Sequence, residues 1–188
     1  MKNHILEILK KYKAQFPNDQ DLDKFFDYLS KNDNVIDRKN MNGHITVSAL
    51  VVKDKKALLL WHKTFQSLMQ PGGHIDPPDK TVFEAAIREV KEETGLDVEK
   101  DHIFADGIFS GIPISLDVHP ILANEKKQES AHYHYDMYFY LKLKNEDQEI
   151  KNEDDGVEGA QWFDLEKIDE SFNGVTFKAV RKYKSLSL

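Results

Sequence analysis

Apolar residues in the first 40 positions of the chain recur at helical spacing, in two groups separated by Phe16-Pro17-Asn18. Residues three or four apart share one face of a helix, so the pattern predicts two amphipathic helices. We interpret their apolar faces as packing against the main body of the protein; a dimer contact or a lid over a substrate is the alternative. The apolar positions are Ile5, Leu6, Ile8, Leu9 and Tyr12, then Leu22, Phe25, Phe26 and Leu29.

From His44 onward the pattern changes to short apolar runs typical of strands. Residues 45–52 and 57–61 are separated by a polar stretch at 53–56, which indicates a hairpin. A helix is predicted up to Thr94, and the later elements are strands at 114–122, 132–143 and 159–163 and a helix at 172–184. This mixture favours the α/β class, with a mixed sheet covered by helices. We expect a helical extension over residues 1–40 and one main domain over residues 41–188.

The composition of the 188-residue chain excludes several classes of function. The chain has no cysteine, which excludes disulfides, a thiol nucleophile and zinc sites built on thiolates. Its longest apolar runs are about five residues, against the ~20 that cross a bilayer. The formal net charge of −7 disfavours unspecific binding to nucleic acid or anionic membrane. We expect a soluble, cytoplasmic protein, in which a metal ion neutralises any anionic phosphate ligand.

The helix that leads to Thr94 has clear end signals. Thr81 and Glu84 have the three-residue spacing of a capping box. Gly95 is a residue type that favours the position just after a helix. The helix therefore spans a defined stretch, with an apolar arc on the side that faces the core.

Three carboxylates gather on another face of this helix. Glu89, Glu92 and Glu93 fall within about 100° of one another around the helix axis. They lie near the helix C-terminus, where the macrodipole already disfavours negative charge. A site for a hard divalent cation such as Mg²⁺ explains the cluster, since Mg²⁺ prefers oxygen ligands. Arg88 can orient a carboxylate, and the carbonyl of Gly73 can join the ligands because glycine permits close backbone approach.

Residues 71–74 (Pro-Gly-Gly-His) and 88–96 (Arg-Glu-Val-Lys-Glu-Glu-Thr-Gly-Leu) resemble the Nudix box of the Nudix hydrolases. The box is usually written G-x5-E-x7-R-E-U-x-E-E-x-G-U, where U is aliphatic, and its second half matches at every fixed position. The resemblance covers residues 44–170, including a late strand at 161–165. It implies an α/β/α sandwich and Mg²⁺- or Mn²⁺-dependent hydrolysis of a nucleoside diphosphate linked to another group.

The resemblance also assigns roles to individual residues. Glu89 and Glu93 are implied to be the main metal ligands, together with Gly73. Glu92 is implied to be a third ligand or to help activate the attacking water, and Arg88 belongs to the same catalytic segment.

A general base in this superfamily often lies on a downstream loop. We favour Glu158 for this role, because it directly precedes the late strand. The other acidic candidates, which we interpret as a solvated loop, are Glu153, Asp154 and Asp155.

The first half of the box departs from the motif. Asp79 stands where the motif has glutamate, and it precedes Arg88 by nine residues instead of eight. The loop is one residue longer and is stiffened by Pro77 and Pro78. We interpret Asp79 as the nearest equivalent of the first glutamate and expect catalysis to be retained.

Histidines and carboxylates alternate on two predicted strands. His134 and Asp136 share one face of the later strand with His132, and Asp117 and His119 alternate in the same way on the earlier strand. A hairpin would bring the two sets together. Two interpretations stay open: hydrogen bonding, structural or to a substrate, and a second site for a transition metal. The candidate substrate-binding residues are His74, His119, His134 and Asp136.

The leading hypothesis is a hydrolase that acts on a small nucleotide-type diphosphate, as a monomer or a homodimer. One alternative is a catalytically silent Nudix-fold sensor that binds nucleotides. Another is a Nudix-fold isomerase of the isopentenyl-diphosphate type, which resembles a family that needs a cysteine for proton transfer. The absence of cysteine makes the isomerase the weaker alternative.

Overall fold

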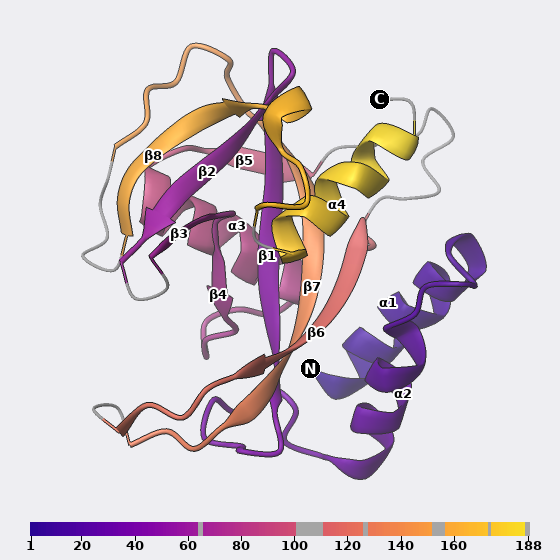
Figure 1. Cartoon of the computed structure of the whole chain (residues 1–188). Helices are drawn as coiled ribbons and strands as arrows, with labels where there is room; N and C mark the ends of the chain where they lie inside the picture. Colours follow the sequence, from indigo (N-terminus) through magenta and orange to yellow (C-terminus); the bar gives the residue numbers. More distant parts are fainter. Residues whose placement is uncertain (64–65, 101–110, 126–127, 152–156, 173, 187–188) are drawn as a thin grey trace.

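The computed structural model describes the whole chain except residues 64–65, 101–110, 126–127, 152–156, 173 and 187–188, and it describes residues 157–158 by their backbone only. Two helices precede an alternation of strands and helices (Figure 1). In chain order the elements are α1 (Lys2–Gln15), α2 (Leu22–Lys31), β1 (His44–Lys53), β2 (Lys56–His62), β3 (Ser67–Met69), β4 (Gly72–His74), α3 (Val82–Thr94), β5 (Val98–Lys100), β6 (Ser115–Ile121), β7 (His132–Leu143), β8 (Val157–Asp164), the 3-10 turn η2 (Leu165–Lys167) and α4 (Gly174–Ser185).

These elements confirm the helices and long strands expected from the apolar pattern. Three short strands were not predicted, namely β3, β4 and β5. Each has three residues, which is too short to show a period in the sequence. Among the helices that the structure describes, none combines the length and apolar character needed to cross a membrane.

The described strands form one mixed sheet around β1. On one side β1 pairs antiparallel with β2, and β2 continues to β3 and β8. On the other side β1 pairs parallel with β7, which carries β5 and β6 as antiparallel neighbours. β4 pairs antiparallel with residues 46–48, in the first half of β1. This topology places β4, β1, β7 and β6 next to one another where the site forms.

Helices cover both faces of the sheet, as the α/β/α expectation requires (Figure 1). On β1, Ile45, Val47 and Ala49 are fully buried in a core shared with α1, α2 and α3. The opposite face contributes Leu50 to a second core, packed on α4. Because side chains alternate along a strand, this second face also carries the polar residues that precede Leu50.

The N-terminal helices pack on the main body, as we expected from their apolar faces. Phe25 and Tyr28 of α2 both contact Tyr135 of β7, with ring centroids 5.5 and 4.1 Å apart, respectively. The Tyr28 hydroxyl donates to the Gly43 carbonyl at 2.6 Å. These helices therefore belong to the principal core; the division of the chain at residue 40 stays a prediction.

A buried polar contact also ties the turn between α1 and α2 to α4. The Tyr12 hydroxyl donates to Asp19 Oδ2 at 2.6 Å, and Lys182 Nζ lies 3.0 Å from the same oxygen. Burial disfavours the charged form of Asp19, but the bonds from Tyr12 and Lys182 outweigh it and lower the pKa of the carboxyl. The charged carboxylate thus helps to hold α4 against the N-terminal helices.

Candidate active site

Both end signals of α3 are confirmed. Thr81 Oγ1 accepts a hydrogen bond from the Glu84 amide at 3.1 Å. At the other end Gly95 adopts φ = 71°, the left-handed conformation that glycine tolerates without a Cβ penalty. Its N–H donates to the Lys91 carbonyl at 2.9 Å. The helix therefore stops directly after its glutamates.

Arg88 joins the carboxylates of the box. Its Nη2 donates to Asp79 Oδ2 at 2.9 Å, and its Nε lies 3.2 Å from Asp79 Oδ1. Its Nη1 donates to Glu89 at 2.9 Å and to Glu92 at 2.7 Å, and Nη2 also donates to the His74 carbonyl at 2.8 Å. The guanidinium thus fixes the loop before α3 and two helix carboxylates at once.

Two glycines let the turn lie directly against two carboxylates. The Gly72 N–H donates to Glu93 Oε2 at 3.0 Å. A Cβ on Gly73 would stand 2.6 Å from Glu89 Oε1, and a Cβ on Gly72 would stand 2.5 Å from the Val47 carbonyl of β1. A side chain at Gly72 would clash with the backbone of β1, whereas one at Gly73 would displace the Glu89 carboxylate. The turn therefore places Glu93 next to the backbone of Gly72 and Glu89 next to the backbone of Gly73.

The environment of Glu89 disfavours the negative charge of its carboxylate, and a nearby cation would offset this effect. Burial raises the pKa of the Glu89 carboxyl to about 7, even though Arg88 favours its charged form. Nearby Glu92 and Asp76 add to the increase in the pKa of Glu89 by repulsion. Positive charge placed near Glu89 would stabilise the carboxylate, which fits a metal-binding role.

Glu92 has a different environment from the other two glutamates. Its side chain is 52% exposed, whereas that of Glu89 is 13% exposed. Glu92 borders a separate shallow hollow next to Arg88, while Glu93 is buried and lines the main cleft. The structure therefore brings Glu89 and Glu93 together at the glycine turn and leaves Glu92 as a partner of Arg88.

The predicted hairpin of β6 and β7 is present. Its register places Asp117 opposite Asp136 and His119 opposite His134. The strand β1 extends this polar surface, because His44 stands opposite His134 and Thr46 stands opposite Asp136.

The surface continues onto β4, where His74 stands opposite Thr46. Two rows of polar side chains thus cross the sheet. One row is His44, His134 and His119, and the other is His74, Thr46, Asp136 and Asp117.

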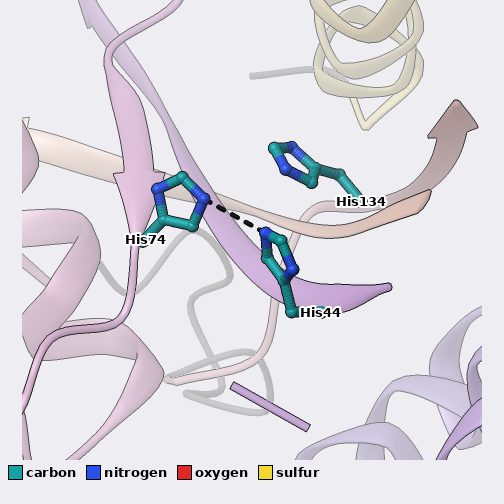
Figure 2. Close-up of side chains that lie close together, drawn as sticks. All are labelled: His44, His74 and His134. Carbon is teal, nitrogen blue, oxygen red and sulfur yellow. Dashed lines mark hydrogen bonds between the residues drawn. The ribbon is translucent and has the colours of Figure 1, made fainter. Parts of the chain in front are cut away.

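Three of these histidines lie close together, with His44 and His74 in contact and His134 beside them (Figure 2). His44 Nε2 lies 3.1 Å from His74 Nε2, and the ring of His134 lies 4.7 Å from that of His44 between centroids. One nitrogen from each of the three lies within 4.8 Å of the others. His132 lies beside them, with ring centroids 4.9 Å from His44 and 5.2 Å from His134.

His134 and His119 differ in how readily they take up a proton. Burial and the neighbouring histidines lower the pKa of His134 to about 2. Burial also opposes the charged form of His119, but its 2.9 Å contact with Asp117 and the nearby Asp136 outweigh burial and raise the pKa of His119. His134 is therefore a neutral imidazole with a free electron pair, whereas His119 carries a proton more readily.

A cleft of about 770 Å³ connects the box to the polar rows. Its lining includes Gly72, Gly73 and Glu93 from the box. From the polar rows it includes His44, Thr46, His74, Asp117, His119, His134 and Asp136. Gly73 and Glu93 of the predicted metal-binding set therefore face the same space as the predicted substrate-binding residues, whereas Glu89 and Glu92 do not line it.

Sequence reasoning missed His44. His44 stands apart from the two histidine-containing strand motifs. The signal that could have found it is its alternation with Thr46 and Ser48, which places the three side chains on one polar face of a strand. Glu158 has its backbone on β8 opposite Trp61, but its side chain lies outside the described residues. The acidic candidates Glu153, Asp154 and Asp155 also lie outside them.

The fold and the box together define a class of protein. The NUDIX domain family matches residues 43–183, and the chain belongs to this family. A NUDIX family hydrolase from Clostridium perfringens is 25% identical, with a TM-score of 0.52, and the match covers 76% of this chain and 97% of that chain.

Two relatives carry more particular names. A probable DHNTP pyrophosphohydrolase of Lactococcus lactis subsp. cremoris is 31% identical over 111 residues, which cover 59% of this chain and 61% of the relative. The chain thus spans less than two thirds of the curated relatives it matches. The dihydroneopterin triphosphate pyrophosphohydrolase of E. coli shares the fold at 14% identity, with a TM-score of 0.52 over 74% of this chain and 93% of that chain.

Proposed function

We propose that this protein is a Mg²⁺-dependent pyrophosphohydrolase that acts on a nucleoside diphosphate linked to another group. The observation that carries the proposal is the placement of Glu89 and Glu93 against the glycine turn. Glu93 accepts from the Gly72 N–H, and Glu89 fills the space next to Gly73. Both carboxylates offer the oxygen ligands that Mg²⁺ prefers.

The residues of the box fit this cation. Mg²⁺ is usually held by one or two carboxylates, with waters and substrate phosphate oxygens completing its ligands. Glu89 and Glu93 are the two carboxylates in our proposal, and the Gly73 carbonyl is a further candidate; Mn²⁺ has the same ligand preferences. A bound Mg²⁺ supplies positive charge that stabilises the phosphoryl oxygens during attack by water.

Other side chains of the site take supporting roles in the proposal. Arg88 holds Glu89 in place, and Glu92 shares the guanidinium, so Glu92 acts through the position of Arg88 or on a water molecule. Glu158 remains our candidate for the general base. His119 and Asp136 line the cleft and are our candidates for hydrogen bonding to the substrate, since both face it from neighbouring strands.

A turnover screen tests the proposal. The purified chain is incubated with Mg²⁺ and a panel of nucleoside diphosphate sugars, dinucleoside polyphosphates, oxidised nucleotides, dinucleotide cofactors and dihydroneopterin triphosphate, the last because a relative carries that name. We expect cleavage of a pyrophosphate bond in at least one of them, measured as released phosphate products. Tight binding without turnover across the panel would favour the silent sensor instead.

A further inference from the structure

The three histidines that meet in the cleft come from three different strands. His44 begins β1, His74 ends β4 and His134 lies on β7 (Figure 2). His44 and His134 are paired directly across the parallel strands, and His74 is paired with the residue two positions after His44. Because strand pairing fixes all three backbones, the three side chains start from neighbouring positions before any ligand arrives.

The spacing of the nitrogens fits a common metal ion. Imidazole nitrogens bound at the ~2.0–2.1 Å of a zinc–nitrogen bond are about 3.3 Å apart in a tetrahedron. The observed separation of His44 Nε2 and His74 Nε2 is 3.1 Å, and a His134 nitrogen lies within 4.8 Å of both ligand atoms. Movement of the His134 nitrogen toward this pair would complete a three-nitrogen site.

Hydrogen bonding alone explains less of this arrangement. A hydrogen bond between two Nε2 atoms needs a proton on one of them, and it needs only two rings. Here the three ring centroids are 4.7, 5.0 and 5.4 Å apart, so all three rings converge.

The surroundings of the three rings also suit a cation. Two carboxyl groups, those of Asp136 and Asp117, follow in the adjacent row. The His132 Nδ1–H donates to the Ser130 carbonyl at 2.7 Å, which fixes the orientation of its ring beside the other three. Bonds of this kind orient imidazoles around metal sites.

We propose that His44, His74 and His134 form a binding site for one divalent transition-metal ion of the Zn²⁺ class, separate from the Mg²⁺ site at the box. Imidazole nitrogen suits Zn²⁺, Co²⁺, Ni²⁺ and Cu²⁺, whereas Mg²⁺ prefers oxygen. Three protein ligands leave a fourth position open to the cleft, where water or a phosphate oxygen of a ligand binds. Metal binding here does not depend on the hydrolase activity.

Metal titration of the chelator-treated full chain tests the site. Zn²⁺ is added in competition with a chromophoric chelator, and Co²⁺ is added in parallel because its visible absorption reports the geometry of its ligands. We expect one tight equivalent of Zn²⁺ per chain and a tetrahedral Co²⁺ spectrum. His44→Gln and His134→Gln should each weaken Zn²⁺ binding by at least ~100-fold, since an amide is a poor ligand for these metals.

Two controls locate the ion. His62→Gln, on β2 outside the three-histidine site, and Glu93→Gln, at the box, should both keep the tight equivalent of Zn²⁺. Loss of Zn²⁺ in Glu93→Gln with retention in His134→Gln would assign the ion to the box and overturn the proposal. Absence of stoichiometric Zn²⁺ binding by the folded wild-type chain would also overturn it.

Circular dichroism without metal shows whether each variant folds. If His134→Gln does not fold, His74→Gln takes its place, because His74 is half-buried at the end of the short strand β4. Retention of tight Zn²⁺ binding and of the tetrahedral Co²⁺ spectrum in folded His74→Gln and His44→Gln would refute the site.

Discussion

Arg88 holds the carboxylate of Asp79 from two sides, with Nη2 2.9 Å from Oδ2 and Nε 3.2 Å from Oδ1. The side chains are 19% and 5% exposed, respectively, so the pair is shielded from water. Asp79 is the residue that departs from the Nudix motif, and it is shorter than the usual glutamate by one methylene. The loop before α3 brings this carboxylate to the arginine.

Replacing Arg88 with Lys should test this relationship. A lysine ammonium cannot hold a carboxylate at two points and reach Glu89 and Glu92 as well. We expect Mg²⁺-dependent turnover to fall by about 10–100-fold, the range found when a partner that orients a metal ligand is lost. Lys142→Arg, at a side chain of β7 that is 43% exposed, is the control. Turnover of Arg88→Lys equal to wild type across a Mg²⁺ titration would show that the guanidinium is not needed.

Glu93→Gln should retain the fold and lose most activity. Its amide oxygen can still accept from the Gly72 N–H, so the turn keeps its contact, but the negative charge for Mg²⁺ is gone. We expect at least a ~10²-fold decrease in turnover, the scale of losing a focused charge contact in the transition state. Glu99→Gln removes an exposed carboxylate on β5 as a control. Full activity of Glu93→Gln at saturating Mg²⁺ would mean that its charge is dispensable.

The two glycines should respond differently to alanine. A Cβ on Gly73 meets the Glu89 carboxylate, which can move, so Gly73→Ala should weaken Mg²⁺ binding more than stability. A Cβ on Gly72 meets the Val47 carbonyl in β1, which cannot move without breaking the sheet. Gly72→Ala should therefore lower the melting temperature more than Gly73→Ala does. Thermal melts together with Mg²⁺ titrations separate the two effects, and equal behaviour of the two variants would contradict this geometry.

Asp19 should contribute stability that depends on pH. Its pKa is lowered by Tyr12 and Lys182, so its contribution is present above its ordinary pKa of 3.8 and is lost as the pH falls through the lowered value. Asp19→Asn should cost about 1–3 kcal/mol of unfolding free energy at pH 7, and the difference from wild type should shrink in acid. Urea unfolding from pH 7 down to pH 3 measures this, with Asp33→Asn as the exposed control. A difference that stays constant with pH would argue against a charged Asp19.

Removing residues 1–40 should destabilise the protein, because their apolar faces belong to the principal core. Phe25 is fully buried, so Phe25→Ala should cost about 3–5 kcal/mol and the neighbouring, less buried Phe26→Ala should cost less. Melting curves of both variants and of the truncated chain provide the measurement. Unchanged melting temperature, oligomeric state and activity after truncation would mark these helices as a dispensable appendage.

The sequence by itself determined the elements with a repeated period or a local end signal. The helical spacing before Phe16 predicted α1, and Thr81 with Gly95 predicted the limits of α3, because caps and amphipathic faces are properties of neighbouring residues. The spacing of the box also predicted which glutamates share a face. The alternation at His119 and His134 predicted two polar strand faces and suggested that they meet.

Only the tertiary structure decided which residues from distant segments share a point. His44, His74 and His134 are separated by 30 and 60 positions, and they meet because β1 pairs with β4 on one side and with β7 on the other. Parallel pairing of β1 and β7 is a long-range choice that local propensity does not encode. The same reason explains why Glu92, alike in sequence to Glu93, is exposed while Glu93 is buried: the glycine turn reaches one side of α3 and Arg88 holds the other.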